Sequence, residues 1–138
     1  MQFALFRCCP TSVFAEQYES STDAVLGKLG VELVDIPEFN CCGYPLKNYA
    51  FKAYVLSSAR NICLAEKRNL NIMTLCNCCY GSLKHADHLL REDPSIRKEI
   101  NATLQKEGLN YDGSIEIRHL LDISALFYFH RETAVALT

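Results

Sequence analysis

No apolar run in this 138-residue sequence reaches the roughly 18 residues that a membrane-spanning helix needs. The N-terminus also lacks a secretory pattern, because Arg7 and two cysteines follow only a short apolar stretch. Basic residues form no run or stripe of the kind that binds nucleic acid. We therefore expect a cytoplasmic protein with no membrane span and no nucleic-acid partner.

The sequence also lacks internal repeats, low-complexity segments and linkers, so residues 1–138 are expected to form one domain. Hydrophobic residues make up 49% of the chain and charged residues 22%, which indicates an ordered globular protein. Eight cysteines are present. In a reducing compartment, clustered cysteines point to metal or redox chemistry rather than to structural disulfides.

Short apolar stretches alternate with longer stretches of helical spacing. The predicted strands are Gln2–Phe6, Val31–Ile36, Asn71–Leu75 and Ser114–Arg118. The predicted helices are Thr11–Leu29 (ended by Gly30), Asn48–Lys67, Ser82–Leu90, Ser95–Glu107 and Leu120–Tyr128. This alternation predicts an α/β fold with a small, mainly parallel sheet flanked by helices.

Seven of the eight cysteines follow a predicted strand. They are Cys8 and Cys9 after the first strand, Cys41 and Cys42 after the second, and Cys76, Cys78 and Cys79 after the third. The carboxyl ends of parallel strands share one edge of the sheet, which is where such folds bind ligands. The three groups of cysteines are therefore expected to converge on one site.

The chemistry of this site is expected to be that of a thiolate metal centre. The spacing Cys76-x-x-Cys79 lets two thiolates bind one centre, and the helix predicted after it directs its N-terminal N–H groups at the preceding turn, Cys76 to Gly81. Four thiolates suit an iron–sulfur cluster or zinc. Gly43, beside Cys41 and Cys42, indicates a close approach of the backbone to something else.

Other residues near these segments receive structural interpretations. Cys63 lies on the apolar face of a helix and is predicted to be a core thiol. His85 and His88 are expected to face solvent or make polar contacts rather than bind zinc, and His119 receives no role. Three tyrosines flank the cysteine loops and are predicted to pack in the core, or alternatively to shield a cluster; they are Tyr44, Tyr49 and Tyr80.

The order Cys9, Cys41-Cys42-Gly43 and Cys76-x-x-Cys79 resembles the CCG domain, the cysteine-rich module of the B subunit of heterodisulfide reductase. The segment Thr74–Leu83 is similar to the CNGCYGSL turn of that family, and Leu29–Asp35 is similar to its second strand. The similarity extends from Met1 to about Leu126, which is nearly the whole chain.

The resemblance implies a Rossmann-like domain that carries a noncubane [4Fe-4S] cluster. Carried over residue by residue, the ligands would be Cys9, Cys41, Cys42, Cys76 and Cys79. The resemblance further implies an oxidoreductase acting on sulfur groups, in which electrons reach a disulfide such as that of coenzymes M and B. Its partners would be the iron–sulfur electron-donor subunit of such a reductase and a second CCG domain or paralogous subunit.

The sequence departs from the family pattern at three points. Cys78 occupies a position that is usually glycine, and Cys8 precedes Cys9, so both are possible extra ligands. Only one CCG domain is present, whereas the family's reductase subunit holds two face to face. We therefore expect a chain that is incomplete as an enzyme and acts within a complex.

Two alternatives stay open from the residues alone. A structural zinc module would use Cys9, Cys41, Cys76 and Cys79 as a tetrahedral site that docks a partner subunit. A metal-free thiol–disulfide switch would use only Cys76 and Cys79.

Overall fold

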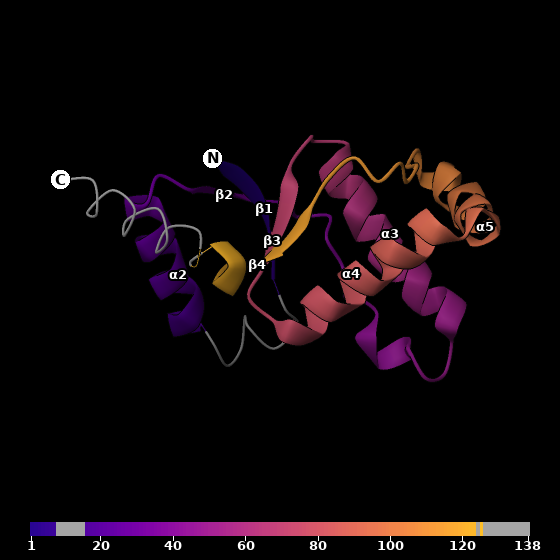
Figure 1. Cartoon of the computed structure of the whole chain (residues 1–138), viewed down its shortest axis with the longest axis horizontal. Coiled ribbons are helices and arrows are strands. Elements are labelled where there is room, and N and C mark those ends of the chain that lie inside the picture. The colour runs from indigo at the N-terminus through magenta and orange to yellow at the C-terminus, as the bar shows by residue number, and fades with distance from the viewer. Residues whose placement is uncertain (8–15, 124, 126–138) are drawn as a thin grey trace.

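In the computed structural model, which describes residues 1–7, 16–123 and 125, four parallel strands form one sheet (Figure 1). The strands are β1 (Gln2–Phe6), β2 (Glu32–Asp35), β3 (Asn71–Thr74) and β4 (Ile117–His119). Their order across the sheet is β2–β1–β3–β4. The predicted α/β fold with a small parallel sheet is confirmed.

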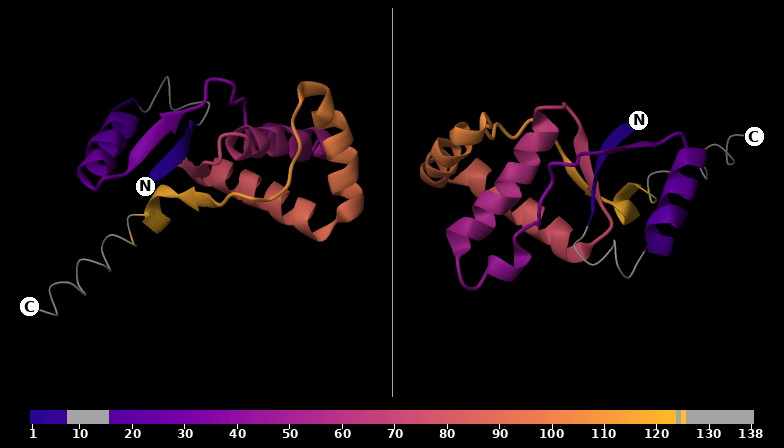
Figure 2. Two further views of the ribbon diagram at one scale, coloured as in Figure 1. Left: turned by 90° about the horizontal axis from the view of Figure 1, so that it is seen from above. Right: turned by 180° about the vertical axis from the view of Figure 1, so that it is seen from behind.

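Helices cover both faces of the sheet (Figure 2). Helix α2 (Glu16–Lys28) and the helical residues 120–123 lie on one face, and α3 (Phe51–Glu66) and α4 (Asn77–Glu92) on the other. Helix α5 (Pro94–Leu104) packs on α3 and α4 rather than on the strands. The central strand β1 is therefore buried on both faces: Phe3 and Leu5 join the α2 side, and Ala4 and Phe6 the other.

The strand order places the cysteine-bearing segments at one edge. The chain passes from β1 to β2 on one side and then crosses back to β3 on the other side of β1. In open parallel sheets, ligands bind at the carboxyl ends of the strands, where the order reverses in this way. The segment after β2, with its single 3₁₀ turn η1 (Tyr44–Leu46), and the segment after β3 both leave from this edge.

Helix α4 begins earlier than its sequence predicts. A tight turn was expected over Cys76–Gly81 and a helix from Ser82, but the helix starts at Asn77, and the Tyr80 N–H donates to the Cys76 carbonyl at 2.8 Å. The buried stripe of α4 already includes Cys79, three residues before Ser82. Burial of Cys79 thus extends the helical repeat through a segment whose polar residues suggested a turn.

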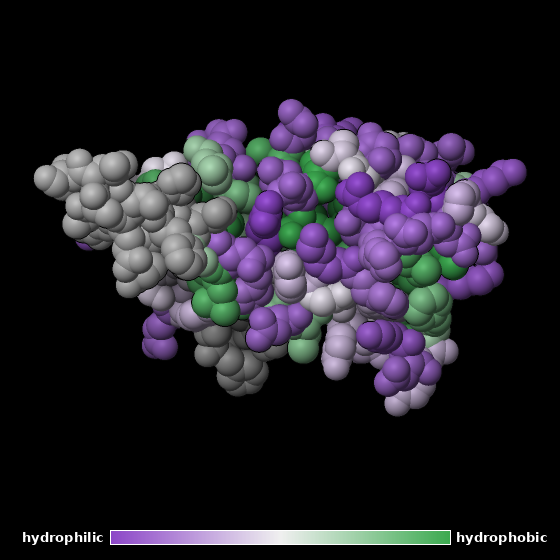
Figure 3. Space-filling view, viewed as in Figure 1, coloured by the Kyte–Doolittle hydropathy of each residue, from purple (hydrophilic) through white to green (hydrophobic). Residues whose placement is uncertain are grey.

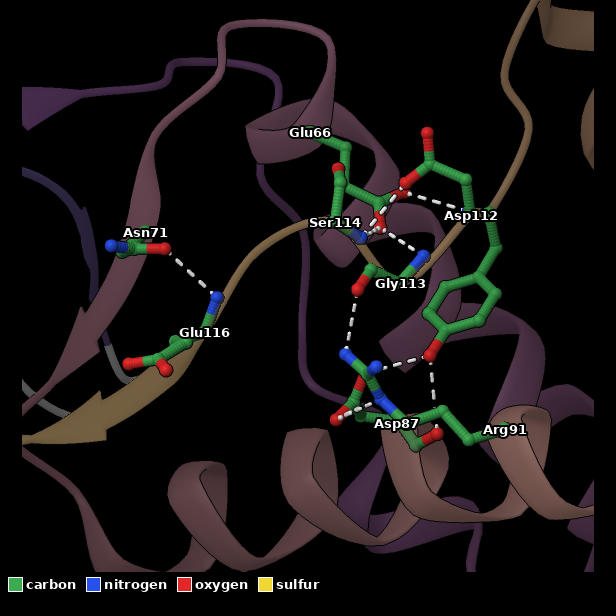
Figure 4. A network of polar contacts seen from close by, with 9 residues as sticks. Glu66, Asn71, Asp87, Arg91, Asp112, Gly113, Ser114 and Glu116 are labelled. Carbon is green, nitrogen blue, oxygen red and sulfur yellow. Dashed lines mark hydrogen bonds and ion pairs between the residues drawn. The ribbon is translucent and has the colours of Figure 1, made fainter.

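Strand β4 is shorter than predicted and starts at Ile117 rather than Ser114. Side chains hold much of the backbone before it (Figure 4), although the Glu116 carbonyl still accepts the Ile72 N–H at 2.9 Å. The Glu66 carboxylate accepts the N–H groups of Gly113 at 2.7 Å and Ser114 at 3.1 Å, and the Asn71 amide oxygen accepts that of Glu116 at 2.8 Å. These bonds occupy donors that a longer strand would need.

Most other boundaries agree with the sequence prediction to within a few residues. Gly30, two residues after the end of α2, has φ 75°, which is the left-handed conformation expected of a helix-ending glycine. Helix α5 continues as the 3₁₀ turn η2 (Gln105–Glu107). The predicted helix segments at 11–15 and beyond residue 125 lie outside the described residues.

The side chains over α4 and α5 are mainly hydrophilic, with apolar side chains visible in the middle of the same face (Figure 3). Among the described residues, no helix is both long and apolar enough to span a bilayer.

Candidate metal centre

Helix α3 holds the loop that carries Cys41 and Cys42. The Ser57 hydroxyl donates to the Cys41 carbonyl at 2.6 Å, and the Ser58 hydroxyl donates to the Cys42 carbonyl at 2.5 Å. The Asn61 amide donates to the Cys41 carbonyl at 3.3 Å. Because Ser58 is fully buried, its bond to Cys42 forms in a region from which water is excluded. The backbone of the two cysteines is thus fixed by the protein itself.

Gly43 makes the close approach that the sequence predicts. Its φ is 86°, and a Cβ atom there would lie 2.9 Å from the Tyr54 carbonyl oxygen. The neighbour is therefore the backbone of α3. The same turn lets the Gly43 N–H donate to the Cys41 sulfur at 3.4 Å.

The second group of cysteines lies at the start of α4. Cys76 is the N-cap residue, with extended backbone angles, and its N–H donates to the Thr74 hydroxyl at 3.3 Å. In the first turn, Cys79 faces inward and is 2% exposed, whereas Cys78 faces solvent. The unpaired N–H groups and the dipole at a helix N-terminus favour thiolates close to it.

The two groups of cysteines meet at Cys42 and Cys79. A hydrogen bond with the Cys79 thiol is the main cause of a lowered pKa of Cys42, about 6 against an ordinary value of 9.0. The Tyr44 N–H, the Ser82 hydroxyl and the Cys41 thiol lower it further, and burial opposes them. The Cys42 thiol of the loop and the Cys79 thiol of α4 thus meet at a buried site in which Cys42 favours the thiolate, the form that binds metals.

The outcome for the predicted ligands is mixed. The structure brings Cys41, Cys42 and Cys79 into one group and places Cys76 at the adjoining helix cap, whereas Cys8 and Cys9 lie outside the described residues. Within 1–7, 16–123 and 125, no three or more histidine, cysteine, aspartate or glutamate side chains are already arranged to hold a metal ion. The five-cysteine ligand set therefore stays a prediction.

Tyr54 joins α3 to α4 directly behind this group. The Tyr54 side chain is fully buried, and its hydroxyl donates to the Ser82 carbonyl at 3.2 Å. The same oxygen lies 3.0 Å from Nδ1 of His85. Since a hydroxyl has one proton, His85 carries the proton on Nδ1 when Tyr54 donates to Ser82. The polar contact predicted for His85 is confirmed, and His88 is exposed.

The Ser82 side chain is 3% exposed, and its hydroxyl makes no full hydrogen bond to any atom of the described chain. It nevertheless lies close enough to the Cys42 thiol to lower that group's pKa. A buried polar atom in this condition is uncommon in native proteins.

Three further expectations have clear outcomes. Cys63 is a core residue, 2% exposed, and burial raises the pKa of its thiol, so the prediction is confirmed. The prediction of core packing is wrong for Tyr44 and Tyr49, which are 52% and 90% exposed. His119, which received no role, is buried with its ring edge against Tyr80, at the carboxyl end of β4.

The sequence interpretation missed the residues that hold the cysteine loop. Ser57, Ser58 and Asn61 are polar residues within a helix whose neighbouring positions are apolar. Polar side chains at such buried positions must find hydrogen-bond partners, and that requirement was the available signal.

Comparison with known proteins adds to this geometry. A family model described as the CCG cysteine-rich domain matches residues 3–84. The chain is 35% identical over 123 residues to the B subunit of the ferredoxin/F420H2-dependent CoB-CoM heterodisulfide reductase of Methanosarcina acetivorans, covering 88% of this chain and 41% of that protein. It is 33% identical to the 8-methylmenaquinol:fumarate reductase membrane anchor subunit of Wolinella succinogenes, covering 90% of this chain and 43% of that one.

Among solved structures, a hypothetical protein from Helicobacter pylori superposes with a TM-score of 0.77 at 28% identity, covering 86% of this chain and 24% of that one. The chain thus spans less than half the length of each of these relatives.

Proposed function

Because this chain belongs to the family of CCG cysteine-rich domains, we propose that it is the iron–sulfur redox part of a heterodisulfide reductase-like complex. The cluster we propose is a noncubane [4Fe-4S] centre. Its ligands would be Cys9, Cys41, Cys42, Cys76 and Cys79. The single observation that carries the proposal is the buried contact between Cys42 and Cys79, which joins two cysteine loops from separate strands.

The donor set suits this group. The Cys42 thiol interacts with the thiols of Cys41 and Cys79, and Cys76 lies at the adjoining helix cap. These thiols, together with the buried Ser82 hydroxyl that has no hydrogen-bond partner in the described chain, fit a bound cluster that has sulfur atoms of its own. When bound, the cluster would supply one-electron transfer and iron atoms able to bind a substrate sulfur. The protein's part is to hold the thiolates at fixed positions, through Ser57, Ser58 and the N-terminus of α4.

The positions of the cysteines also favour particular ligands. Cys78 faces solvent on the first turn of α4 while Cys79 faces the buried thiols, which supports Cys76 and Cys79 as the ligand pair. The contact of Cys79 with Cys42 argues against a switch confined to Cys76 and Cys79.

A small sulfur substrate has a route to this edge. A cavity of about 420 Å³ opens beside Cys41, between the carboxyl ends of β1 and β2, with Leu5 and Phe39 among its walls. Cleavage of a disulfide to two thiols consumes two electrons and two protons, so an electron donor is required. We propose an iron–sulfur partner subunit as that donor, within the cytoplasm.

The surface beside the cysteine loop is suited to contact with another protein. Four large apolar side chains are exposed from η1 to the first residue of α3, namely Tyr44, Leu46, Tyr49 and Phe51. Exposed apolar groups that gather on one surface mark interaction sites. The printed names of the relatives are those of subunits, which supports a second CCG domain or a paralogous subunit as the occupant.

Anaerobic purification and reconstitution, followed by iron, sulfide and zinc analysis and by EPR of the oxidised and reduced forms, tests the proposal. We expect a brown protein with about four irons and four sulfides per chain. A colourless protein that retains about one zinc per chain under the same conditions would instead support the structural zinc module.

A further inference from the structure

The Ser82 hydroxyl lacks the bond to its own helix that Thr22 and Thr103 make. In α2, the Thr22 hydroxyl donates to the Tyr18 carbonyl at 2.8 Å, and in α5 the Thr103 hydroxyl donates to the Glu99 carbonyl at 3.4 Å. A hydroxyl side chain within a helix commonly donates to the carbonyl four residues earlier in this way. Ser82 is only 3% exposed, yet its hydroxyl has no such partner within the described chain.

The Ser82 hydroxyl is turned toward the thiols. Ser82 lies three residues after Cys79, so both side chains share one face of α4. That face is buried, and the hydroxyl lies beside the buried Cys42 thiol. The Tyr54 hydroxyl binds the Ser82 carbonyl at 3.2 Å, and this bond fixes the turn of α4 from which the Ser82 side chain projects.

We propose that the Ser82 hydroxyl donates a hydrogen bond to a sulfur of the bound cluster, either a ligand thiolate or a sulfide, and thereby raises the cluster's reduction potential. This inference rests on the proposed function. It assigns a role to a residue outside the cysteine ligand set.

The sign follows from electrostatics. Reduction adds negative charge to the cluster and its sulfurs, so a hydrogen bond to sulfur is stronger in the reduced form than in the oxidised form. The buried site strengthens this difference, because little water is present to replace the bond. Loss of the hydroxyl therefore makes reduction less favourable without removing a ligand.

Four variants of the full chain test the inference after anaerobic reconstitution. Ser82→Ala and Ser82→Val remove the hydroxyl, whereas Ser82→Thr keeps it in a side chain of the same shape as valine. Thr103→Ala removes an exposed hydroxyl from α5 and is the control. The measurement is the midpoint potential from an EPR-monitored redox titration. A second readout is the shift of the Fe–S stretching bands in D₂O by resonance Raman spectroscopy.

We expect the Ala and Val variants to load iron and sulfide as the unaltered protein does. Their reduction should be less favourable by about tenfold, or about 59 mV for a one-electron couple. The D₂O shift should shrink in both. The Thr variant should keep most of the potential, and Thr103→Ala should change neither readout.

The outcomes separate the two proposals. An unaltered protein that takes up no iron and sulfide overturns the proposed function, and the inference with it. Normal loading with equal potentials in all variants overturns the inference alone. Loss of the cluster in both Ala and Val but not in Thr would assign the hydroxyl to cluster retention and would also overturn a potential-setting role.

Discussion

Tyr54 and His85 stack across the interface of α3 and α4, with ring centroids 5.9 Å apart, an angle of 21° between ring planes and the Tyr54 hydroxyl 3.0 Å from Nδ1 of His85. Phe51 lies edge-on to the same imidazole. The pair thus ties α3 to α4 next to Ser82, whose carbonyl also accepts the Tyr54 hydroxyl.

Tyr54→Phe should destabilise the protein while leaving the packing intact. The variant keeps the ring but removes both hydrogen bonds of a fully buried hydroxyl, and it leaves Nδ1 of His85 without its partner. The expected loss is about 1–3 kcal/mol of unfolding free energy, measured by urea titration. The exposed Tyr49→Phe is the matched control and should change the unfolding free energy by less than about 0.5 kcal/mol. Equal stability of the two variants would contradict the role given to the hydroxyl.

Cys42→Ser and Cys63→Ala should have opposite effects on the chromophore. Both cysteines are buried, but Cys42 contacts Cys79 whereas Cys63 lies within the core, with the pKa of its thiol raised by burial. Cys42→Ser should abolish the iron–sulfur absorption after reconstitution. Cys63→Ala should retain it and lose about 1 kcal/mol of stability. A full chromophore in Cys42→Ser would remove Cys42 from the ligand set.

Ser58→Ala tests whether α3 positions the cysteine loop. The substitution removes the 2.5 Å bond to the Cys42 carbonyl and leaves that buried acceptor without the Ser58 donor, at a cost of about 1–3 kcal/mol. We also expect slower cluster reconstitution, because the loop would no longer be held in place before the metal binds. Ser21→Ala, which removes an exposed hydroxyl from α2, serves as the control for both measurements. Reconstitution at the unaltered rate would show that the loop does not depend on this bond.

Glu66→Gln should alter the pH dependence of stability. Burial raises the pKa of Glu66 above its ordinary value of 4.5, although the N–H groups of Asp112 and Gly113 act in the opposite direction. A raised folded pKa contributes stability that is fully present below the unfolded pKa and is lost as pH rises through the folded value. As the pH rises from about 4.5 toward neutral, the unaltered protein should therefore lose stability relative to Glu66→Gln. Urea titrations of both proteins across this range measure the difference in unfolding free energy. A gain in stability of the unaltered protein relative to Glu66→Gln as the pH rises would contradict the sign that we assign.

The parts of the fold that follow apolar periodicity could be predicted from sequence. Strand β1 was assigned at its observed bounds, and the convergence of Cys42 and Cys79 follows from parallel strands whose carboxyl ends share one edge. The start of α4 could not be predicted in this way, because the residues of its first turn are polar and its inward-facing member is a cysteine of the proposed site. The local sequence pattern predicts a turn over Cys76–Gly81, whereas burial of Cys79 against the rest of the protein stabilises a helix there.

Contacts between distant side chains were the other limit. Glu66 caps the backbone of Gly113 and Ser114 from 47 and 48 residues away, which shortens β4, and Ser58 reaches Cys42 across 16 residues. Neither pairing has a local sequence signature. A buried serine or glutamate in an apolar helix predicts that a partner exists without saying which residue it is.

The hydrogen bonds from α3 to the cysteine loop have a consequence for how the protein matures. They join protein atoms alone, so we expect the loop of Cys41 and Cys42 to acquire its position as the chain folds, before a cluster binds. This differs from zinc fingers, in which metal binding and folding are one event. A protein that delivers the cluster would then bind a folded site rather than an unfolded chain. The far-UV circular dichroism spectrum of the metal-free protein should therefore equal that of the cluster-loaded protein.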